Sequence, residues 1–157
     1  MGRIIGIARR EISRGPMEVL EQAQITLSGG LEGDSKGKRF PLRQLTILAI
    51  EDWRATLALL EEPKLDWTVR RANLLVQHIK LPRGIGSRLQ CGDVVLEVTG
   101  QTSPCQQMEN AYAGLRKALA GEWRGGVTCR VLSGGFIKLG DSIDTILHNP
   151  ESVIRLP

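Results

Sequence analysis

Residues 94–99 read Val-Val-Leu-Glu-Val-Thr, and this stretch decides the fold class. Side chains alternate between the two faces of a strand, so positions 94, 96 and 98 place Val, Leu and Val on one face. The other face carries Val95, Glu97 and Thr99 and is only partly apolar. A strand that is apolar on one face and half apolar on the other is typical of a β-barrel wall with a partial outer cover.

Similar runs recur along the chain between Gly-rich turns such as residues 28–30. Two segments instead show the helical spacing of apolar residues, Ile50–Glu61 and Gln106–Leu119. Gly114 weakens the second of these, and Gly121 follows it as a C-cap. The sequence therefore predicts a mainly β fold with a few short helices. The predicted strands are Arg3–Ala8, Val19–Leu27, Arg43–Leu48, Asn73–Ile79, Val94–Thr99, Val127–Ser133 and Ser142–Leu147.

The chain has 157 residues, of which 41% are hydrophobic and 24% charged. This length and balance predict one folded domain over residues 1–157, large enough to bury a core. The longest strongly apolar stretch, residues 45–50, is too short to cross a bilayer, and residues 1–11 carry no signal-peptide pattern. Three cysteines without a Cys-x-x-Cys pair predict neither a disulfide framework nor a zinc site. We expect a cytoplasmic protein without membrane contact.

The net charge is +4, and the densest basic stretch holds Lys36, Lys38, Arg39 and Arg43 with no acidic residue between them. This excess suits a small phosphate-bearing ligand, and it equally fits a solvated loop. Nucleic acid is an unexpected partner, because two Phe, one Tyr and three Trp provide no recognisable stacking platform.

Several common site signatures are absent from the sequence. Residues 37–39 read Gly-Lys-Arg, and without a Ser or Thr after the lysine they do not form a P-loop. Residues 84–86 read Gly-Ile-Gly but lack the third glycine of a dinucleotide-binding turn. The histidines are His78, in a strand-like run, and His148, in a C-terminal loop. Neither can be tied to a nucleophile, and both are interpreted as partly exposed or core histidines.

The three cysteines differ in their surroundings. Cys129 alternates with Val127 and Val131, which predicts a small buried core residue. Cys91 lies in a Gly-Asp turn and has no evident partner. Cys105 lies where a strand ends, a polar loop runs and a proline precedes a predicted helix. Free N–H groups at a helix start stabilise a thiolate, the form that attacks sulfur or binds a soft metal, so Cys105 is the candidate functional cysteine.

A second candidate site is the run Arg70-Arg71-Ala72-Asn73 at the start of a predicted strand. Arg71 and Asn73 are two residues apart, so on a strand they share a face and can offer several donors to one phosphate. Arg70 then points to the opposite face. The alternative interpretation is a cationic strand edge that discourages pairing with another chain.

Ordered motifs along most of the chain resemble the MOSC family, named for the C-terminal domain of molybdenum cofactor sulfurase. Each motif is common alone, but so many in this order and at compatible spacing are specific. They are Gly15-Pro16-Met17, Gly30-Leu31-Glu32-Gly33-Asp34, Arg43-Gln44-Leu45-Thr46, Arg71-Ala72-Asn73-Leu74, Ser103-Pro104-Cys105, Arg124-Gly125-Gly126, Arg130-Val131-Leu132, Gly134-Gly135 and Gly140-Asp141.

The resemblance implies a β-barrel of the MOSC type, a kind also seen in the barrel domain of pyruvate kinase. It implies that Cys105 carries sulfur or ligates molybdenum. It also implies that Arg71, Asn73 and Ser103 help to hold the pterin phosphate of molybdenum cofactor or surround the metal. The sequence departs from the family where residues 35–38 read Ser-Lys-Gly-Lys without a His, and where Ala72 replaces a second Arg.

Two hypotheses for function follow from these residues and this resemblance. The first is a protein that binds molybdenum cofactor through Cys105 and either reduces a small N-hydroxylated substrate or transfers sulfur. It implies a redox or cysteine-desulfurase partner, and pyridoxal phosphate would belong to that separate sulfurase because no aminotransferase-like segment is present. The second is a non-enzymatic barrel that binds a phosphate-bearing partner through Arg70, Arg71 and the stretch 36–43. Alkylation of Cys105 would abolish the first activity and spare the second.

Overall fold

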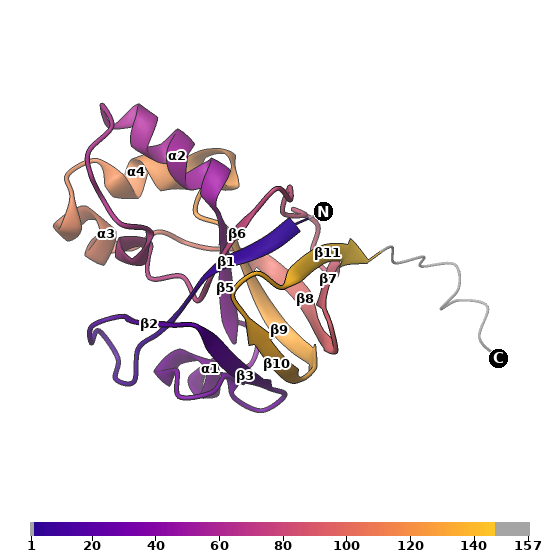
Figure 1. Cartoon of the computed structure of the whole chain (residues 1–157). Helices are drawn as coiled ribbons and strands as arrows, with labels where there is room; N and C mark the ends of the chain where they lie inside the picture. The colour runs from indigo at the N-terminus through magenta and orange to yellow at the C-terminus, as the bar shows by residue number, and fades with distance from the viewer. Residues whose placement is uncertain (1, 147–157) are drawn as a thin grey trace.

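The stretch that predicts a barrel forms strand β8, which lies between two antiparallel neighbours. The computed structural model describes residues 2–146 (Figure 1). Seven strands of an eight-stranded sheet close into a barrel, because β11 and β1 also pair with each other. In order around the ring they are β11 (Ser142–Ile146), β7 (Arg88–Cys91), β8 (Val94–Gln101), β9 (Val127–Ser133), β5 (Leu45–Ala49), β6 (Leu74–Gln77) and β1 (Gly2–Arg9).

The other elements lie on the outside and at the ends of this barrel. Figure 1 shows α2, α3 and α4 gathered on one side of it, with α1 beside β3 lower in the view. Strand β2 pairs with β1, and β10, β3 and β4 form a separate small sheet. These elements are β2 (Glu18–Leu20), β3 (Gln22–Thr26), β4 (Gly30–Leu31), α1 (Ser35–Arg39), α2 (Ile50–Leu59), η1 (Trp67–Arg70), α3 (Gln106–Ala111), α4 (Leu115–Ala120), η2 (Gly121–Trp123) and β10 (Gly135–Lys138).

The observed elements confirm the mainly β prediction and correct it at particular points. The single strand predicted over Val19–Leu27 is interrupted at Glu21, because its two halves pair with different partners, β1 and β10. The helix predicted over Gln106–Leu119 is divided in two: α3 ends at Ala111, Tyr112 is extended, and Gly114, whose φ of +90° is left-handed, precedes α4. His78 follows β6 as an exposed residue and is not part of the strand, and His148 lies outside the described residues.

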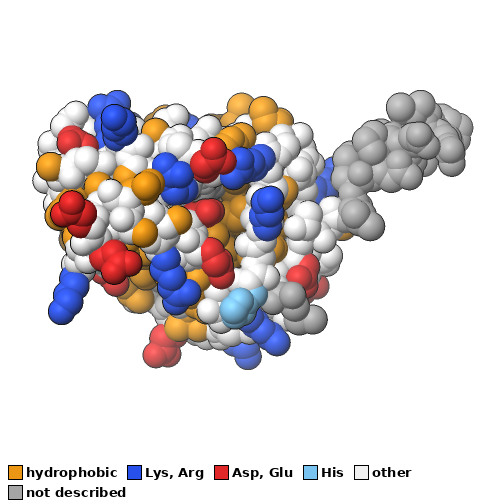
Figure 2. Space-filling view, turned by 90° about the horizontal axis from the view of Figure 1, so that it is seen from above, with side chains coloured by type: hydrophobic (Ala, Val, Ile, Leu, Met, Phe, Trp, Pro, Cys, Tyr) orange, Lys and Arg blue, Asp and Glu red, His pale blue; other side chains and the backbone are white. Residues whose placement is uncertain are grey.

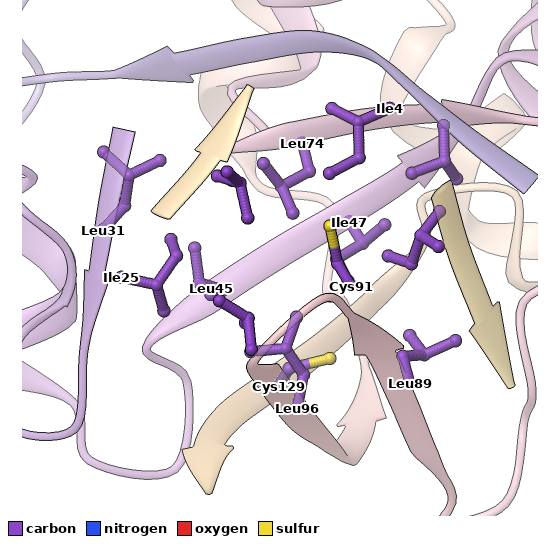
Figure 3. Packing of buried hydrophobic residues seen from close by; sticks show 14 of the residues in the cluster. Ile4, Ile25, Leu31, Leu45, Ile47, Leu74, Leu89, Cys91, Leu96 and Cys129 are labelled. Carbon is purple, nitrogen blue, oxygen red and sulfur yellow. The ribbon is translucent and has the colours of Figure 1, made fainter. Parts of the chain in front are cut away.

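Two hydrophobic clusters hold the fold together, one inside the barrel and one outside it. Ile4, Ile47 and Leu96 belong to the inner cluster, where Cys91 and Cys129 also point among the aliphatic side chains (Figure 3). The buried position of Cys129 confirms the core role predicted from its alternation with valines. The outer cluster lies between the wall and the helices and contains Leu48, Trp53, Leu75, Met108, Leu115 and Leu119.

Strands β5 and β6 are parallel, and α2 connects them across the outside of the barrel. All five residues of β5 are buried, as expected for a strand covered on both faces. Because the two strands run the same way, their first residues meet at one end and their last residues at the other. Separate cavities occur at these two ends. None of the described helices is long and apolar enough to cross a membrane.

Candidate functional site

A cavity of about 270 Å³ lies on the outer side of the barrel wall, between α1 and α3, where β5 and β6 begin. We call it the basic cavity. Thr128 of β9 lines it, whereas its neighbours Val127 and Cys129 face the barrel core, so the cavity lies on the outer face of the wall. Five lining residues are basic and none is acidic, which makes the cavity a site for anions. The basic residues are Arg10, Lys36, Arg43, Arg70 and Arg71.

Arg70 is the most buried of these cations, with 5% of its surface exposed. Its Nε donates a hydrogen bond to the carbonyl oxygen of Gly125 at 3.0 Å. Burial lowers the pKa of Arg70 to about 10, while nearby Cys105 raises it and Arg10 lowers it further. An anion bound in the cavity would stabilise the charged form of Arg70 and so offset the free-energy cost of burying its charge.

Arg71 follows η1 in a left-handed conformation, with φ of +64°. That conformation turns its side chain toward the same cavity as Arg70, where it donates a hydrogen bond to the carbonyl oxygen of Gly15. Its Nε is buried and has no partner among the described residues. Burial and Arg10 lower the pKa of Arg71, and Cys105 and Asp34 act in the opposite direction.

Lys36 reaches the cavity from α1. Burial, followed by the charges of Arg70, Arg10 and Arg43, lowers its pKa to about 8, and Asp34 opposes this shift. Helix α1 packs closely against the backbone of residue 29 because residue 37 is a glycine. A Cβ at position 37 would lie 1.9 Å from the carbonyl oxygen of residue 29.

Asp34 is the buried carboxylate nearest to these cations, although it does not line the cavity. Its Oδ1 accepts a hydrogen bond from the backbone N–H of Arg10 at 3.0 Å, which ties the end of β1 to the start of α1. Its Oδ2 has no partner among the described residues. Asp34 therefore positions Arg10 and supplies a partial counter-charge to Lys36 and Arg71.

Cys105 lines the basic cavity as an exposed residue directly before α3. Its Sγ lies 3.4 Å from the Sδ of Met108, which is itself buried. The other two cysteines are buried in the barrel core: burial raises the pKa of the Cys129 thiol, and burial together with Asp141 raises that of Cys91 to about 11. Of the three thiols, only Cys105 is accessible beside cations.

Ser103 also lines the basic cavity, so the structure brings Arg71, Ser103 and Cys105 together at one place. The neighbouring Thr102 contributes a buried Oγ1 that has no partner in the described part of the chain. Polar groups that stay buried without a partner are rare in native proteins and indicate an additional ligand or water.

Asn73 does not line the basic cavity. Its Oδ1 accepts hydrogen bonds from the N–H of Thr46 at 3.0 Å and from its hydroxyl at 3.3 Å, and its Nδ2 donates to the carbonyl oxygen of Ala8 at 3.2 Å. The expected shared strand face of Arg71 and Asn73 is wrong, because β6 begins only at Leu74. For the same reason Arg70 does not point away from Arg71, and both line one cavity.

Sequence reasoning did not identify Arg10 or Phe40 as cavity residues. Arg10 follows Arg9 at the end of β1, and successive side chains alternate. Arg9 forms an ion pair with Glu18 at 2.8 Å, whereas Arg10 lines the cavity. Phe40 lies under the guanidinium of Arg43, 4.7 Å from the ring centroid, and both residues line the cavity. The acid-free stretch 36–43 was the available signal, and the structure shows two of its four cations, Lys36 and Arg43, in the cavity.

Comparisons with known proteins agree with this architecture. The YuaD protein of Bacillus subtilis has 18% sequence identity and a TM-score of 0.76, with 91% of this chain and 94% of that chain covered. YiiM from Escherichia coli has 15% sequence identity and a TM-score of 0.71, with 94% of this chain and 71% of that chain covered. At these identities the likeness shows the fold alone.

Among curated proteins, none matches the sequence significantly. The family model of the MOSC domain matches residues 34–144, more than half of the chain, and the chain therefore belongs to the MOSC domain family.

Proposed function

We propose that the basic cavity binds molybdenum cofactor and that Cys105 supplies its thiolate to the metal. The observation that carries this proposal is the lining of the cavity: five cations, no carboxylate and one exposed thiol meet in about 270 Å³. Membership of the MOSC family supports the same ligand, since the family is associated with this cofactor.

The residues present fit the chemical groups of the cofactor. Its phosphate is an anion, and guanidinium groups bind phosphate through paired, charge-assisted hydrogen bonds. Arg71 Nε and Thr102 Oγ1 are buried donors without a protein partner among the described residues, and both residues line the cavity. Thiolate sulfur is a soft ligand suited to a metal of this kind.

Each residue has a separate task in this proposal. The bound cofactor supplies two-electron redox chemistry that amino-acid side chains lack. Arg70 and Arg71 hold the phosphate, with Lys36 adding charge, and Ser103 offers a hydroxyl beside Cys105. Cys105 holds the metal. Asn73 joins β5 and β1 beside the start of β6 and does not line the cavity.

The activity that we propose is reduction of a small N-hydroxylated compound with electrons from a redox partner. Transfer of sulfur from a cysteine-desulfurase partner is the alternative for the same cysteine, with pyridoxal phosphate confined to that partner. We place the protein in the cytoplasm, and the three free cysteines support a reducing compartment.

The test is anaerobic purification from molybdenum-replete cells, followed by metal and pterin analysis. We expect molybdenum and pterin in equal amounts in the wild type, and molybdenum lost from Cys105→Ser. Cys91→Ser is the matched control, because it removes a thiol that is buried in the barrel core. Equal molybdenum content in the wild type and in Cys105→Ser would overturn the assignment of Cys105.

A second function rests on the same cluster of cations without the thiol. In it the cavity holds a phosphate-bearing partner through Arg70, Arg71, Lys36 and Arg43 and performs no chemistry. Alkylation separates the two functions, since it blocks Cys105 and leaves the guanidinium groups intact. Phosphate binding that survives alkylation, in a protein purified without molybdenum, would favour this second function.

A further inference from the structure

A second hollow, of about 320 Å³, opens at the opposite end of the parallel pair, where β5 and β6 finish. We call it the mouth pocket. It shares no lining residue with the basic cavity. The mouth of a β-barrel and the carboxyl ends of parallel strands are both common places for a small-molecule site.

The floor of the mouth pocket is the upper layer of the barrel core. Ala49, Leu81 and Val127 belong to the inner hydrophobic cluster, and Trp123 packs against that cluster while remaining partly exposed. Figure 2 shows hydrophobic side chains in a hollow of this face, with acidic side chains along one edge and basic ones along the other. Binding of a ligand over exposed apolar surface is favourable, because it removes that surface from water.

Most charges around the mouth pocket already have partners. Arg83 lies 3.6 Å from the carboxylate of Glu122, and it donates a hydrogen bond to the carbonyl oxygen of that residue at 2.8 Å. Glu51 accepts a hydrogen bond from the backbone N–H of His78 at 3.0 Å. Lys80 lines the pocket as an exposed side chain.

Among the carboxylates of the pocket, that of Asp52 is the exception. It has no hydrogen bond or ion pair within the described part of the chain, although it lines the pocket from the first turn of α2. Burial raises its pKa, with Arg83 and Arg124 opposing and Glu51 adding to the shift. A cation placed next to a partly buried carboxylate stabilises its ionised form.

The rim of the pocket is held in one conformation by strained backbone. His78, Glu122 and Trp123 are non-glycine residues with left-handed φ values of 59°, 51° and 54°. Such residues persist only where the surrounding structure holds them, and they cluster at ligand sites. The hydrogen bonds from the His78 backbone N–H to Glu51 and from Arg83 to the carbonyl oxygen of Glu122 provide that support.

We propose that the mouth pocket binds a small organic ammonium compound with an aromatic or apolar body. The ammonium group pairs with Asp52, and the body covers Ala49, Leu81 and Val127 beside the ring of Trp123. Asp52 carries the carboxylate of this pocket that has no hydrogen bond or ion pair within the described part of the chain, so a cation is favoured over an anion beside it. A tryptophan face adds attraction for an ammonium group. This site is independent of molybdenum cofactor, because the proposed cofactor residues lie in the other cavity.

The test uses benzylammonium, benzyl alcohol and benzoate, which share one body and differ in charge. Binding is followed by NMR through the indole N–H signals of the three tryptophans, with Trp123→Phe identifying the signal of Trp123. We expect the Trp123 signal to shift on titration, and benzylammonium to bind about fivefold more tightly than benzyl alcohol, the size of ~1 kcal/mol for a partly exposed ion pair. Benzoate should bind most weakly.

Asp52→Asn should abolish the preference for benzylammonium and leave benzyl alcohol binding unchanged. Glu62→Gln is the matched control, because it removes one carboxylate just past the other end of α2, in an exposed position. Equal affinities of the wild type for the charged and neutral compounds would overturn the proposal, and this result needs no variant to fold. An equal loss in Asp52→Asn and Glu62→Gln would overturn it as well.

Discussion

The guanidinium of Arg70 donates a hydrogen bond from Nε to the carbonyl oxygen of Gly125, at 3.0 Å, between segments 55 residues apart. This bond joins the end of η1 to the turn before β9. The turn can lie against β5 because Gly126 has φ of +93°, and a Cβ there would lie 2.0 Å from the carbonyl oxygen of Ile47. The other two guanidinium nitrogens have no hydrogen bond within the described residues, so they are available to an anion in the basic cavity.

Replacing Arg70 by Lys should weaken both the fold and the site. A lysine keeps the charge but loses the Nε–H that bonds the carbonyl oxygen of Gly125, so we expect a loss of about 1–3 kcal/mol in the free energy of unfolding. Urea denaturation measures this change, and molybdenum content measures the effect on the cofactor. Arg54→Lys, on an exposed position of α2, is the control. Wild-type stability and molybdenum content in Arg70→Lys would contradict the role of Arg70.

Replacing Arg71 by Lys should weaken cofactor binding with less effect on stability. Its backbone is already left-handed, and the guanidinium bonds only the carbonyl oxygen of Gly15. We expect retention of the cofactor to weaken by about 1–3 kcal/mol, the scale of a hydrogen bond to a charged group. Competitive release of the cofactor to an apo acceptor protein measures it. Retention equal to that of the wild type would exclude Arg71 from the site.

The three cysteines should separate by reactivity and by stability. Iodoacetamide should modify Cys105 and spare Cys91 and Cys129 in the folded protein, because only Cys105 is exposed. Peptide mass mapping checks this. Cys129→Ser places a hydroxyl in the apolar core, and we expect it to cost about 1–3 kcal/mol of stability while Cys105→Ser costs little. A Cys105→Ser variant that unfolds as readily as Cys129→Ser would refute this ranking.

Anion binding should fall as the pH rises through about 8, where Lys36 loses its proton in the folded protein. Sulfate is a suitable probe because its charge is constant in this range, and its affinity should drop about fivefold, on the scale of one ~1 kcal/mol charge interaction. Isothermal titration between about pH 7 and about pH 9.5 measures it. Lys36→Met should abolish the change, and a pH dependence that persists in this variant would assign it to another group.

The stability of the fold should change in the opposite direction over the same range. The unfolded chain keeps the Lys36 proton up to the ordinary pKa of 10.5, whereas the folded protein releases it from about 8 upward. The unfolded state therefore binds more protons between these values, and the contribution of Lys36 to stability rises with pH.

Asn73→Ala should destabilise the protein by about 1–3 kcal/mol, because its side chain bonds β5 and β1 from a buried position. Binding of sulfate to the folded variant should remain within about twofold of the wild type, since Asn73 does not line the basic cavity. Denaturation and calorimetry separate the two effects. A stable variant with sulfate affinity lost would return Asn73 to the binding residues.

The sequence by itself determined the local features of this protein. Alternation over residues 94–99 and 127–133 predicted wall strands and a buried Cys129, because the strand period of two forces alternate side chains to one face. Gly114 predicted a weak point in the second helix, because glycine is a poor helix former, and the structure divides that segment into α3 and α4. The ordered motifs identified the family from short segments, most of them in turns or loops beside strands and helices.

Only the tertiary structure decided which distant residues meet. Pairing of β1 with β11 closes the barrel, and that contact joins residues about 140 apart in the chain. The left-handed turn at Arg71 directs Arg70 and Arg71 into one cavity, which a strand pattern would have separated. The basic cavity and the mouth pocket exist because the parallel pair β5 and β6 has two ends, and each end gathers side chains from loops that no sequence spacing relates.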